Sequence, residues 1–175
     1  MRSARTWESD RPVHGMNPLT VLIAWAAVAA CTACGAVNER PYLNPLPNAV
    51  VDTVHSLPSA LITEIEILLI AEGMEIQRSS PREGYLETKW YDTEAGRTGG
   101  GRTRDPHSVV RLRFFASPIG EELTELTAEA VMRHTLDPSL PERENERMVS
   151  RDHPGDALLN RVLTAVEEHF GAGHS

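Results

Sequence analysis

The chain has 175 residues, of which 41% are hydrophobic and 24% are charged, a composition typical of one globular domain with additional polar segments. The formal net charge is −8, and only 5% of the residues are aromatic. This acidic balance argues against nucleic acid as a partner, because binding to phosphate backbones needs clustered Lys and Arg.

The first segment of the chain has the pattern of a secretory signal peptide. Arg2, Arg5 and Arg11 precede a largely apolar run of 12 residues, Leu19 to Ala30. The run is too short to span a bilayer comfortably and has the length of a signal-peptide core. We therefore predict a signal peptide over residues 1–30, with an uncleaved membrane anchor or a buried helix as the alternative.

Both cysteines of the chain, Cys31 and Cys34, lie directly after this run. The motif Val28-Ala29-Ala30-Cys31 resembles the lipobox of bacterial lipoproteins. This resemblance implies that Cys31 is acylated and becomes the mature N-terminus, with Cys34 as the rival site. A redox role for the Cys-x-x-Cys pair would need a folded βα support, whereas this pair follows a leader.

The lipoprotein resemblance also predicts where the protein is located. Two or three acyl chains anchor a protein firmly without a spanning helix. No Asp follows either cysteine, which in this family favours transfer to the outer membrane, facing the periplasm. Three basic and two acidic residues precede Cys31, so the rest of the chain has 14 basic and 23 acidic residues and a net charge of −9.

Residues 31–50 are predicted to form a linker after the lipidated cysteine. Pro41, Pro45 and Pro47 disfavour a helix and favour an extended, semi-stiff tether. A single folded domain is expected over residues 51–171, followed by a short tail over residues 172–175.

Hydrophobic periodicity predicts two helices and four strands in this domain. The helices are expected over residues 56–72 and 154–170, and the strands over residues 74–78, 84–92, 109–116 and 123–134. Residues 135–153 are expected to form a polar, proline-punctuated loop. A helix is the alternative for the last strand, but the turn Ser117 to Gly120 before it favours a hairpin. The order α-β-β-β-β-α predicts an α+β two-layer sandwich, with a four-stranded antiparallel sheet and both helices on one face.

Alternation along the strands predicts which side chains share the other face of the sheet. In the second strand, Leu86 and Trp90 are expected in the core. Tyr85 and Tyr91 are expected on the opposite face, together with Arg111 and Arg113 of the third strand. Exposed aromatic and arginine side chains are enriched at protein interfaces, so these four residues are a candidate interface.

Other patterns carry weaker signals. The glycine-rich segment of residues 93–107 lacks a Gly-Lys-Ser/Thr ending, so we interpret it as a hairpin tip rather than a phosphate site. His169 and His174 lack the i, i+4 spacing of metal ligands on one helical face. Adjacent glutamates at 121–122 and 167–168 point in different directions. No catalytic residue, metal ligand or cofactor site is predicted.

The domain also resembles a known family of envelope lipoproteins. A lipobox, a helix followed by strands, the pattern Gly-x-Leu-x-Thr-x-Trp at Gly84 to Trp90, and arginines at 111 and 113 are similar to the repeated domain of BamC-type (NlpB/DapX) lipoproteins. That family has a helix-grip fold and belongs to the outer-membrane β-barrel assembly machinery. The resemblance implies a helix-grip-like, non-enzymatic module, although the family usually has two such domains.

The sequence thus predicts a membrane-anchored periplasmic lipoprotein that acts as a non-catalytic interaction module, accessory to outer-membrane or envelope assembly. Its expected partners are the membrane, through the N-terminal lipid, and other envelope proteins. The alternative is a lipoprotein that binds a lipid or small apolar ligand between helices and sheet, because the first helix is apolar over a wide arc. An enzyme with an unrecognised site is the third hypothesis.

Overall fold

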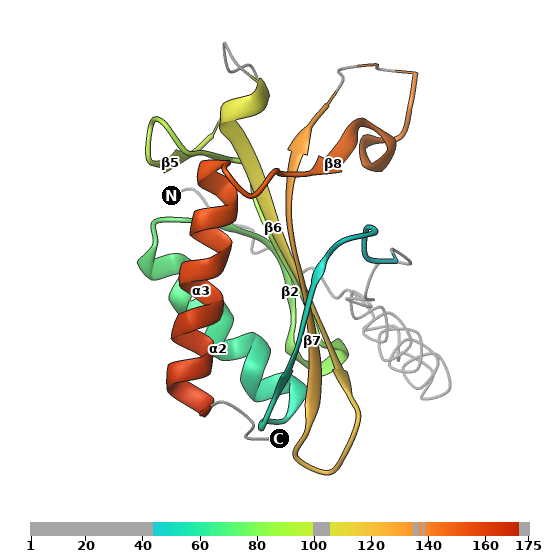
Figure 1. Ribbon diagram of the computed structural model, residues 1–175, viewed down its shortest axis with the longest axis vertical. Helices are drawn as coiled ribbons and strands as arrows, with labels where there is room; N and C mark the ends of the chain where they lie inside the picture. The colour runs from blue at the N-terminus through green and yellow to red at the C-terminus, as the bar shows by residue number, and fades with distance from the viewer. Residues whose placement is uncertain (1–43, 100–105, 135–136, 138, 172–175) are drawn as a thin grey trace, which may run out of the picture. The chain divides into compact units, whose positions relative to one another are not determined.

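The computed structural model describes residues 44–99, 106–134, 137 and 139–171 (Figure 1). These residues belong to a unit that spans residues 38–175. The predicted signal peptide, both cysteines and most of the predicted linker lie outside the described residues.

Two helices form where the periodicity predicts them. Helix α2 spans Pro58–Ala71 and helix α3 spans Pro154–Phe170, and each has proline in its first turn, where no hydrogen-bond donor is needed. His153 caps α3, since its Nδ1 accepts a hydrogen bond from the Gly155 backbone N–H at 2.9 Å. After α2 the chain turns at Gly73, whose φ is +81°, and Met74 N–H donates back to the Leu69 carbonyl at 3.0 Å.

The sheet contains eight strands, and every described pairing between them is antiparallel. The strands are β1 (Val50–Val54), β2 (Ile76–Ser80), β3 (Tyr85–Thr88), β4 (Tyr91–Asp92), β5 (Arg97–Thr98), β6 (Val109–Pro118), β7 (Thr124–Arg133) and β8 (Glu146–Met148). Their main order is β1-β7-β6-β3-β2, while β8 also pairs with β7 and β4 pairs with both β5 and β6. Short 3-10 turns occur at Pro81–Glu83, Pro106–Ser108 and Glu142–Asn145 (η1, η2 and η3).

The prediction of an α+β fold with an antiparallel sheet is confirmed, but the prediction of four strands is wrong. All four predicted strands are present, and residues 124–133 form a strand rather than a helix, paired with β6 through a hairpin. Three further strands appear. β1 follows the proline-rich segment and pairs with β7, β5 has two residues, and β8 lies in a segment predicted to be a polar loop.

The second predicted strand is interrupted by a one-residue bulge, which makes it two strands, β3 and β4. Glu87 pairs with Arg113, whereas Tyr91 pairs with Val110. The chain thus advances four residues from Glu87 to Tyr91, while β6 advances only three between their partners. Within the interruption, the Leu112 N–H donates to the Thr88 hydroxyl at 3.0 Å. Because side chains alternate along a strand, one extra residue moves all later side chains to the opposite face.

The main core lies between the helices and one face of the sheet. Both helices cover the same face, as predicted (Figure 1). Leu61, Ile65, Leu69, Leu112 and Phe114 are completely buried there. The opposite face is covered in part by residues 141–148, and Leu46 packs there against a small second core of Trp90, Val109 and Val131.

Candidate functional site

The most unusual feature of the domain is a group of charged side chains on the sheet face away from the helices. We call it the arginine–glutamate cluster. Its members come from β3, β6, β7, η3 and β8: Glu87, Arg111, Arg113, Glu129, Arg133, Glu142, Arg143 and Glu146. Four positive and four negative groups therefore balance within it.

Arg113 lies at the centre of the cluster and is only 2% exposed. Its Nη1 and Nη2 donate to the two carboxylate oxygens of Glu146 at 2.7 and 2.8 Å, and its Nε donates to Glu87 at 3.0 Å. A bidentate pair of this kind is among the strongest hydrogen-bonded contacts in proteins. It holds β8 against the middle of the sheet.

Arg143 makes a second bidentate pair. Its Nη1 and Nη2 each lie 3.0 Å from an oxygen of Glu129, whose residue is completely buried. Nη2 also donates to the Asn44 carbonyl at 2.8 Å, and the Leu46 N–H donates to the Glu129 carboxylate. The cluster thus ties both η3 and residues 44–46 to the sheet.

Arg111 is bound less completely. Its Nη1 lies 3.0 Å from Glu87, 3.5 Å from Glu142 and 3.6 Å from Glu146. Its Nε is buried and has no hydrogen-bond partner among the described residues. The guanidinium carbon lies 4.4 Å from the Trp90 ring centroid, so a cation–π contact replaces part of the missing hydrogen bonding.

Trp90 joins the cluster to the second core. The guanidinium carbon of Arg133 also lies 4.4 Å from the ring centroid, and the indole Nε1 donates to Glu142 at 3.0 Å. The ring therefore satisfies its one polar atom while it packs against Val109 and Val131.

The cluster changes the pKa of several groups. Burial alone would lower the pKa of Arg113, but its hydrogen bond to Glu146 and the charges of Glu146 and Glu87 outweigh burial and raise it. Burial, followed by the charge of Glu87, raises the pKa of Tyr85. Burial favours the neutral form of Glu142, but the Trp90 hydrogen bond and the Arg111 and Arg133 charges outweigh it and lower its pKa.

The predicted exposure of the candidate interface is wrong. Tyr85, Arg111 and Arg113 are 0%, 8% and 2% exposed. Residues 142–146 cover the two arginines, and Tyr85 packs against Phe115 and Glu87. Tyr91 is half-buried and packs against the main core on the helix side, because the bulge reverses its direction. For the same reason, Trp90 lies in the second core rather than in the main core with Leu86.

The sequence interpretation missed the remaining members of the cluster. Alternation along 123–134 does place Glu129 and Arg133 opposite the core residues Ala128 and Met132. No local pattern, however, pairs them with Glu142, Arg143 and Glu146, which lie in a segment predicted to be a polar loop.

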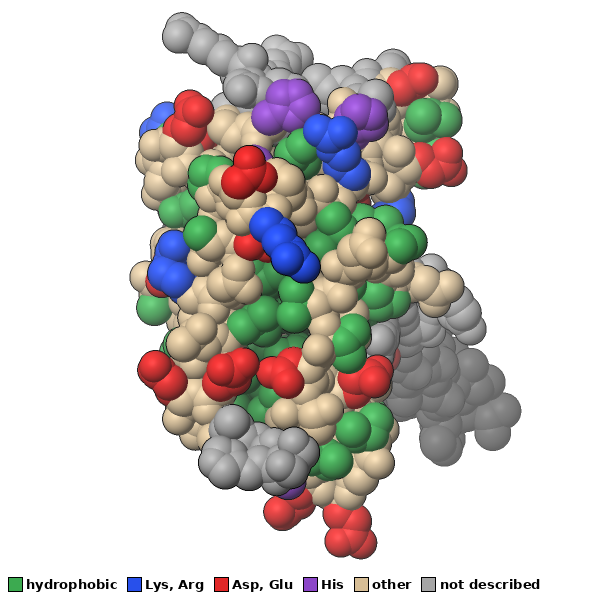
Figure 2. All heavy atoms as spheres, in the orientation of Figure 1, with side chains coloured by type: hydrophobic (Ala, Val, Ile, Leu, Met, Phe, Trp, Pro, Cys, Tyr) green, Lys and Arg blue, Asp and Glu red, His purple; other side chains and the backbone are tan. Residues whose placement is uncertain are grey.

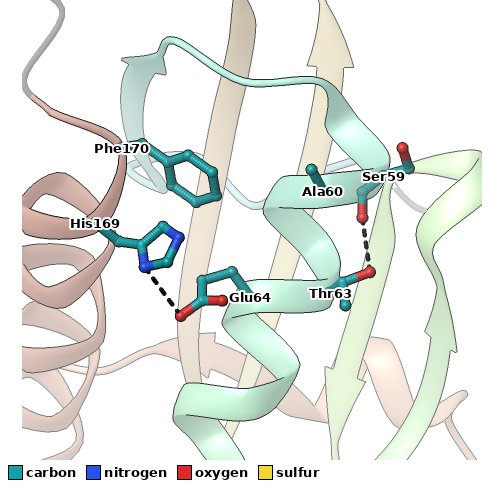
Figure 3. A pocket seen from close by; sticks show the side chains of 6 residues that line it. All are labelled: Ser59, Ala60, Thr63, Glu64, His169 and Phe170. Carbon is teal, nitrogen blue, oxygen red and sulfur yellow. Dashed lines mark hydrogen bonds and ion pairs between the residues drawn. The ribbon is translucent and has the colours of Figure 1, made fainter.

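The described surface includes several hollows. One of about 410 Å³ borders the cluster and includes Arg78, Arg111, Glu142 and Arg143. Another of about 410 Å³ lies between α2 and α3, where His169 Nδ1 is 3.4 Å from Glu64 and the Phe170 ring faces Ala60 (Figure 3). A third, of about 830 Å³, lies between the start of β1 and residues 147–151.

The structure also describes part of the glycine-rich segment and side chains of the kinds that can bind a metal. The turn after β4 is held by Asp92, whose carboxylate accepts the backbone N–H groups of Glu94 and Ala95 at 3.0 and 2.8 Å. Part of the glycine-rich segment, residues 100–105, lies outside the described residues. In the described part of the chain, no group of three or more His, Cys, Asp or Glu side chains is placed to hold a metal ion.

Comparison of the chain with protein families and curated proteins finds no match. No protein-family model matches the chain, and no curated protein matches it. Within the described ranges, neither helix has the length and apolar character needed to cross a membrane.

Proposed function

We propose that the chain is a lipid-anchored, non-catalytic interaction module of the bacterial cell envelope. In this proposal Cys31 carries the lipid, the linker of residues 31–50 is the tether, and the α+β domain contacts other envelope proteins. The anchor places the domain at the outer membrane, facing the periplasm.

One observation supports the proposal: the domain binds the chain at Asn44 and Leu46, inside the predicted linker of residues 31–50. The Asn44 carbonyl and the Leu46 N–H bind Arg143 and the buried Glu129. These contacts fix residues 44–46 to the sheet. In the proposal, this contact is the point at which the tether joins the domain.

The helix-grip-like architecture belongs to the same proposal. Two helices on one face of an antiparallel sheet agree in kind with the BamC-type resemblance. The additional strands β1, β5 and β8 are not part of the predicted pattern. An accessory role in outer-membrane assembly is therefore proposed on the sequence resemblance alone.

Binding of a lipid or small apolar ligand between helices and sheet is less well supported. The side chains of α2 and α3 that face the sheet are at most 8% exposed, so they line no open groove between helices and sheet. The extra apolar residues of α2, Ile67 and Ile70, are 56% and 57% exposed, so they cover no internal space.

The anchor is tested by intact mass and membrane fractionation of the full chain in a lipoprotein-processing bacterium. We expect an acylated protein in the membrane fraction, and loss of both the lipid mass and the membrane location in Cys31→Ser. Cys34→Ser is the matched control and should keep both. Unmodified wild-type protein in the soluble fraction would refute the proposal.

A further inference from the structure

Strand β1 is an edge of the sheet that is open to pairing. It pairs with β7 on one side, and no described strand pairs with its other side. The Thr53 N–H donates to the Asp52 carboxylate at 2.7 Å rather than to β7. Because backbone groups alternate in direction along a strand, Val51 and Thr53 point their N–H and C=O groups away from β7.

The side chains of β1 are also unusually apolar for a free edge. Val51 is 60% exposed and Val50 is 36% exposed. Edge strands are commonly protected by charges, prolines or bulges, and β1 carries only Asp52. Figure 2 shows hydrophobic side chains gathered in a stripe between α3 and β1, crossed by a row of acidic side chains.

The hollow of about 830 Å³ lies at the N-terminal end of β1. Val50, Met132 and Val149 give it apolar walls, and Arg147 and Arg151 line it as well. Neither arginine forms an ion pair with a described residue, in contrast to the arginines of the cluster. Asp156 also lines the hollow, which thus combines apolar surface with two arginines and one carboxylate and has a net positive charge.

A second copy of the chain is a poor occupant for this edge. The register that pairs all of β1 with itself in antiparallel fashion sets Asp52 opposite the same residue of the copy. Like charges directly opposite one another destabilise a strand pair. The net charge of −8 adds repulsion between copies.

We propose that β1 and this hollow bind the carboxyl-terminal segment of a partner protein as an added antiparallel strand. The added strand displaces the Asp52 carboxylate from the Thr53 N–H and pairs with Val51 and Thr53. Since it is antiparallel, it runs toward Val50, and its carboxyl end arrives at the hollow. There Arg147 and Arg151 meet the terminal carboxylate, and the apolar walls take the last side chain. A basic side chain opposite Asp52 completes the match, and strand addition of this kind is a common mode of peptide recognition.

This inference rests on the proposed interaction module and names the chemistry of its partner. A segment running in the parallel direction would bring an amino terminus to the two arginines, where like charges repel. The charges of the hollow therefore favour a free carboxyl end over a free amino end.

The test uses the full chain, purified from membranes in detergent, and an array of short peptides with free carboxyl ends. Each peptide is also present with an amidated end. We expect selected peptides to have an apolar last residue and a basic residue two positions before it. Fluorescence anisotropy of a selected peptide should show at least a tenfold loss of affinity on amidation.

Two pairs of variants test whether the peptide binds at β1 and at the hollow. Val51→Pro removes an outward N–H without removing a β7 hydrogen bond and should abolish binding, whereas Val51→Thr should bind normally. The double variant Arg147→Glu/Arg151→Glu should weaken binding at least tenfold. The matched double variant Arg82→Glu/Arg97→Glu, at exposed arginines elsewhere, should not.

Three results would overturn the inference: no saturable binding by any peptide, equal binding of free and amidated ends, or self-association that Val51→Pro abolishes. None of them bears on the lipid anchor, which the Cys31→Ser fractionation tests separately.

Discussion

Arg113 donates three hydrogen bonds to carboxylates and is almost completely buried. A buried ion pair adds little net stability compared with apolar residues of the same volume, because desolvation offsets the attraction. Removal of one partner has a much larger effect, since it leaves the other charge buried without compensation. The cluster therefore specifies where residues 141–148 lie more than it adds to the free energy of unfolding.

Arg113→Ala should lower the free energy of unfolding by about 3–5 kcal/mol, because Glu146 and Glu87 lose their main partner. Urea unfolding measures this loss, with Arg97→Ala as an exposed control that should change stability by less than about 0.5 kcal/mol. The double variant Arg113→Met/Glu146→Leu should recover part of the loss. A change below about 1 kcal/mol in Arg113→Ala would show that the cluster is loosely held.

Tyr85 is the second residue with a strong local consequence. Its ring packs 5.2 Å from the Phe115 ring, and its hydroxyl donates to Glu87 at 3.1 Å. Burial and the Glu87 charge both favour the neutral phenol and raise its pKa. A group whose pKa is raised by folding stabilises the fold below its ordinary pKa, and this contribution is lost as pH rises above it.

In an alkaline absorbance titration, one of the three tyrosines should therefore ionise only when the protein unfolds. Above about pH 10 the stability of the wild type should fall, and Tyr85→Phe should remove part of that dependence. Tyr91→Phe is the control. If all tyrosines ionise together in the folded protein, the buried position of Tyr85 is wrong.

At the scale of elements, Gly84 controls how β3 meets β6. Its φ is +64°, and a Cβ at this position would lie 2.0 Å from the Ala116 carbonyl oxygen. The Ala116 N–H donates to the Gly84 carbonyl at 2.8 Å, so the two backbones are already in contact. Any side chain here must push β3 away from β6.

A left-handed backbone conformation alone costs a non-glycine residue about 1–2 kcal/mol. Gly84→Ala should therefore lower the free energy of unfolding by more than this amount. Gly73→Ala is a matched control, because Gly73 has a φ of +81° but no atom within 4 Å of the added Cβ. Thermal unfolding of both variants should give the larger loss at Gly84. Equal losses would mean that the backbone approach at Ala116 adjusts freely.

The sequence predicts correctly the elements that have strong hydrophobic periodicity. It does not predict the features that depend on contacts between residues far apart in the chain. α2, α3, β6 and β7 follow from apolar patterns, and the hairpin follows from the turn between the last two. The bulge at Lys89–Trp90 has no sequence signal, because alternation continues through it. β8 forms because Arg113 and Glu146 meet across 33 positions, which no local pattern reveals.

At the scale of the whole molecule, the charges are divided unevenly. Arginines and glutamates compensate one another on the face opposite the helices, while a row of acidic side chains crosses the face between α3 and β1 (Figure 2). The arginine–glutamate cluster fixes residues 141–148 to the sheet, whereas the row of acidic side chains is exposed to partners. We expect added salt to affect partner binding more than folding, since exposed charges are screened most.

Acid should weaken the contact between residues 141–148 and the sheet. The pKa of Glu142 is lowered by folding, so its stabilising contribution is complete above its ordinary value of about 4.3 and is lost as pH falls. The urea midpoint should drop less between neutral and acid pH in Glu142→Gln than in the wild type. Glu144→Gln, at an exposed neighbour without a described ion pair, should match the wild type.

The position of Trp90 makes its intrinsic fluorescence a probe of the arginine–glutamate cluster. The chain has three tryptophans, and Trp7 and Trp25 both precede Cys31, so a protein processed at that cysteine keeps only Trp90. Its indole touches Arg111 and Arg133 and donates to Glu142, the residue that begins η3. Intrinsic fluorescence of the processed protein would then follow, without any label, the release of η3 from the sheet.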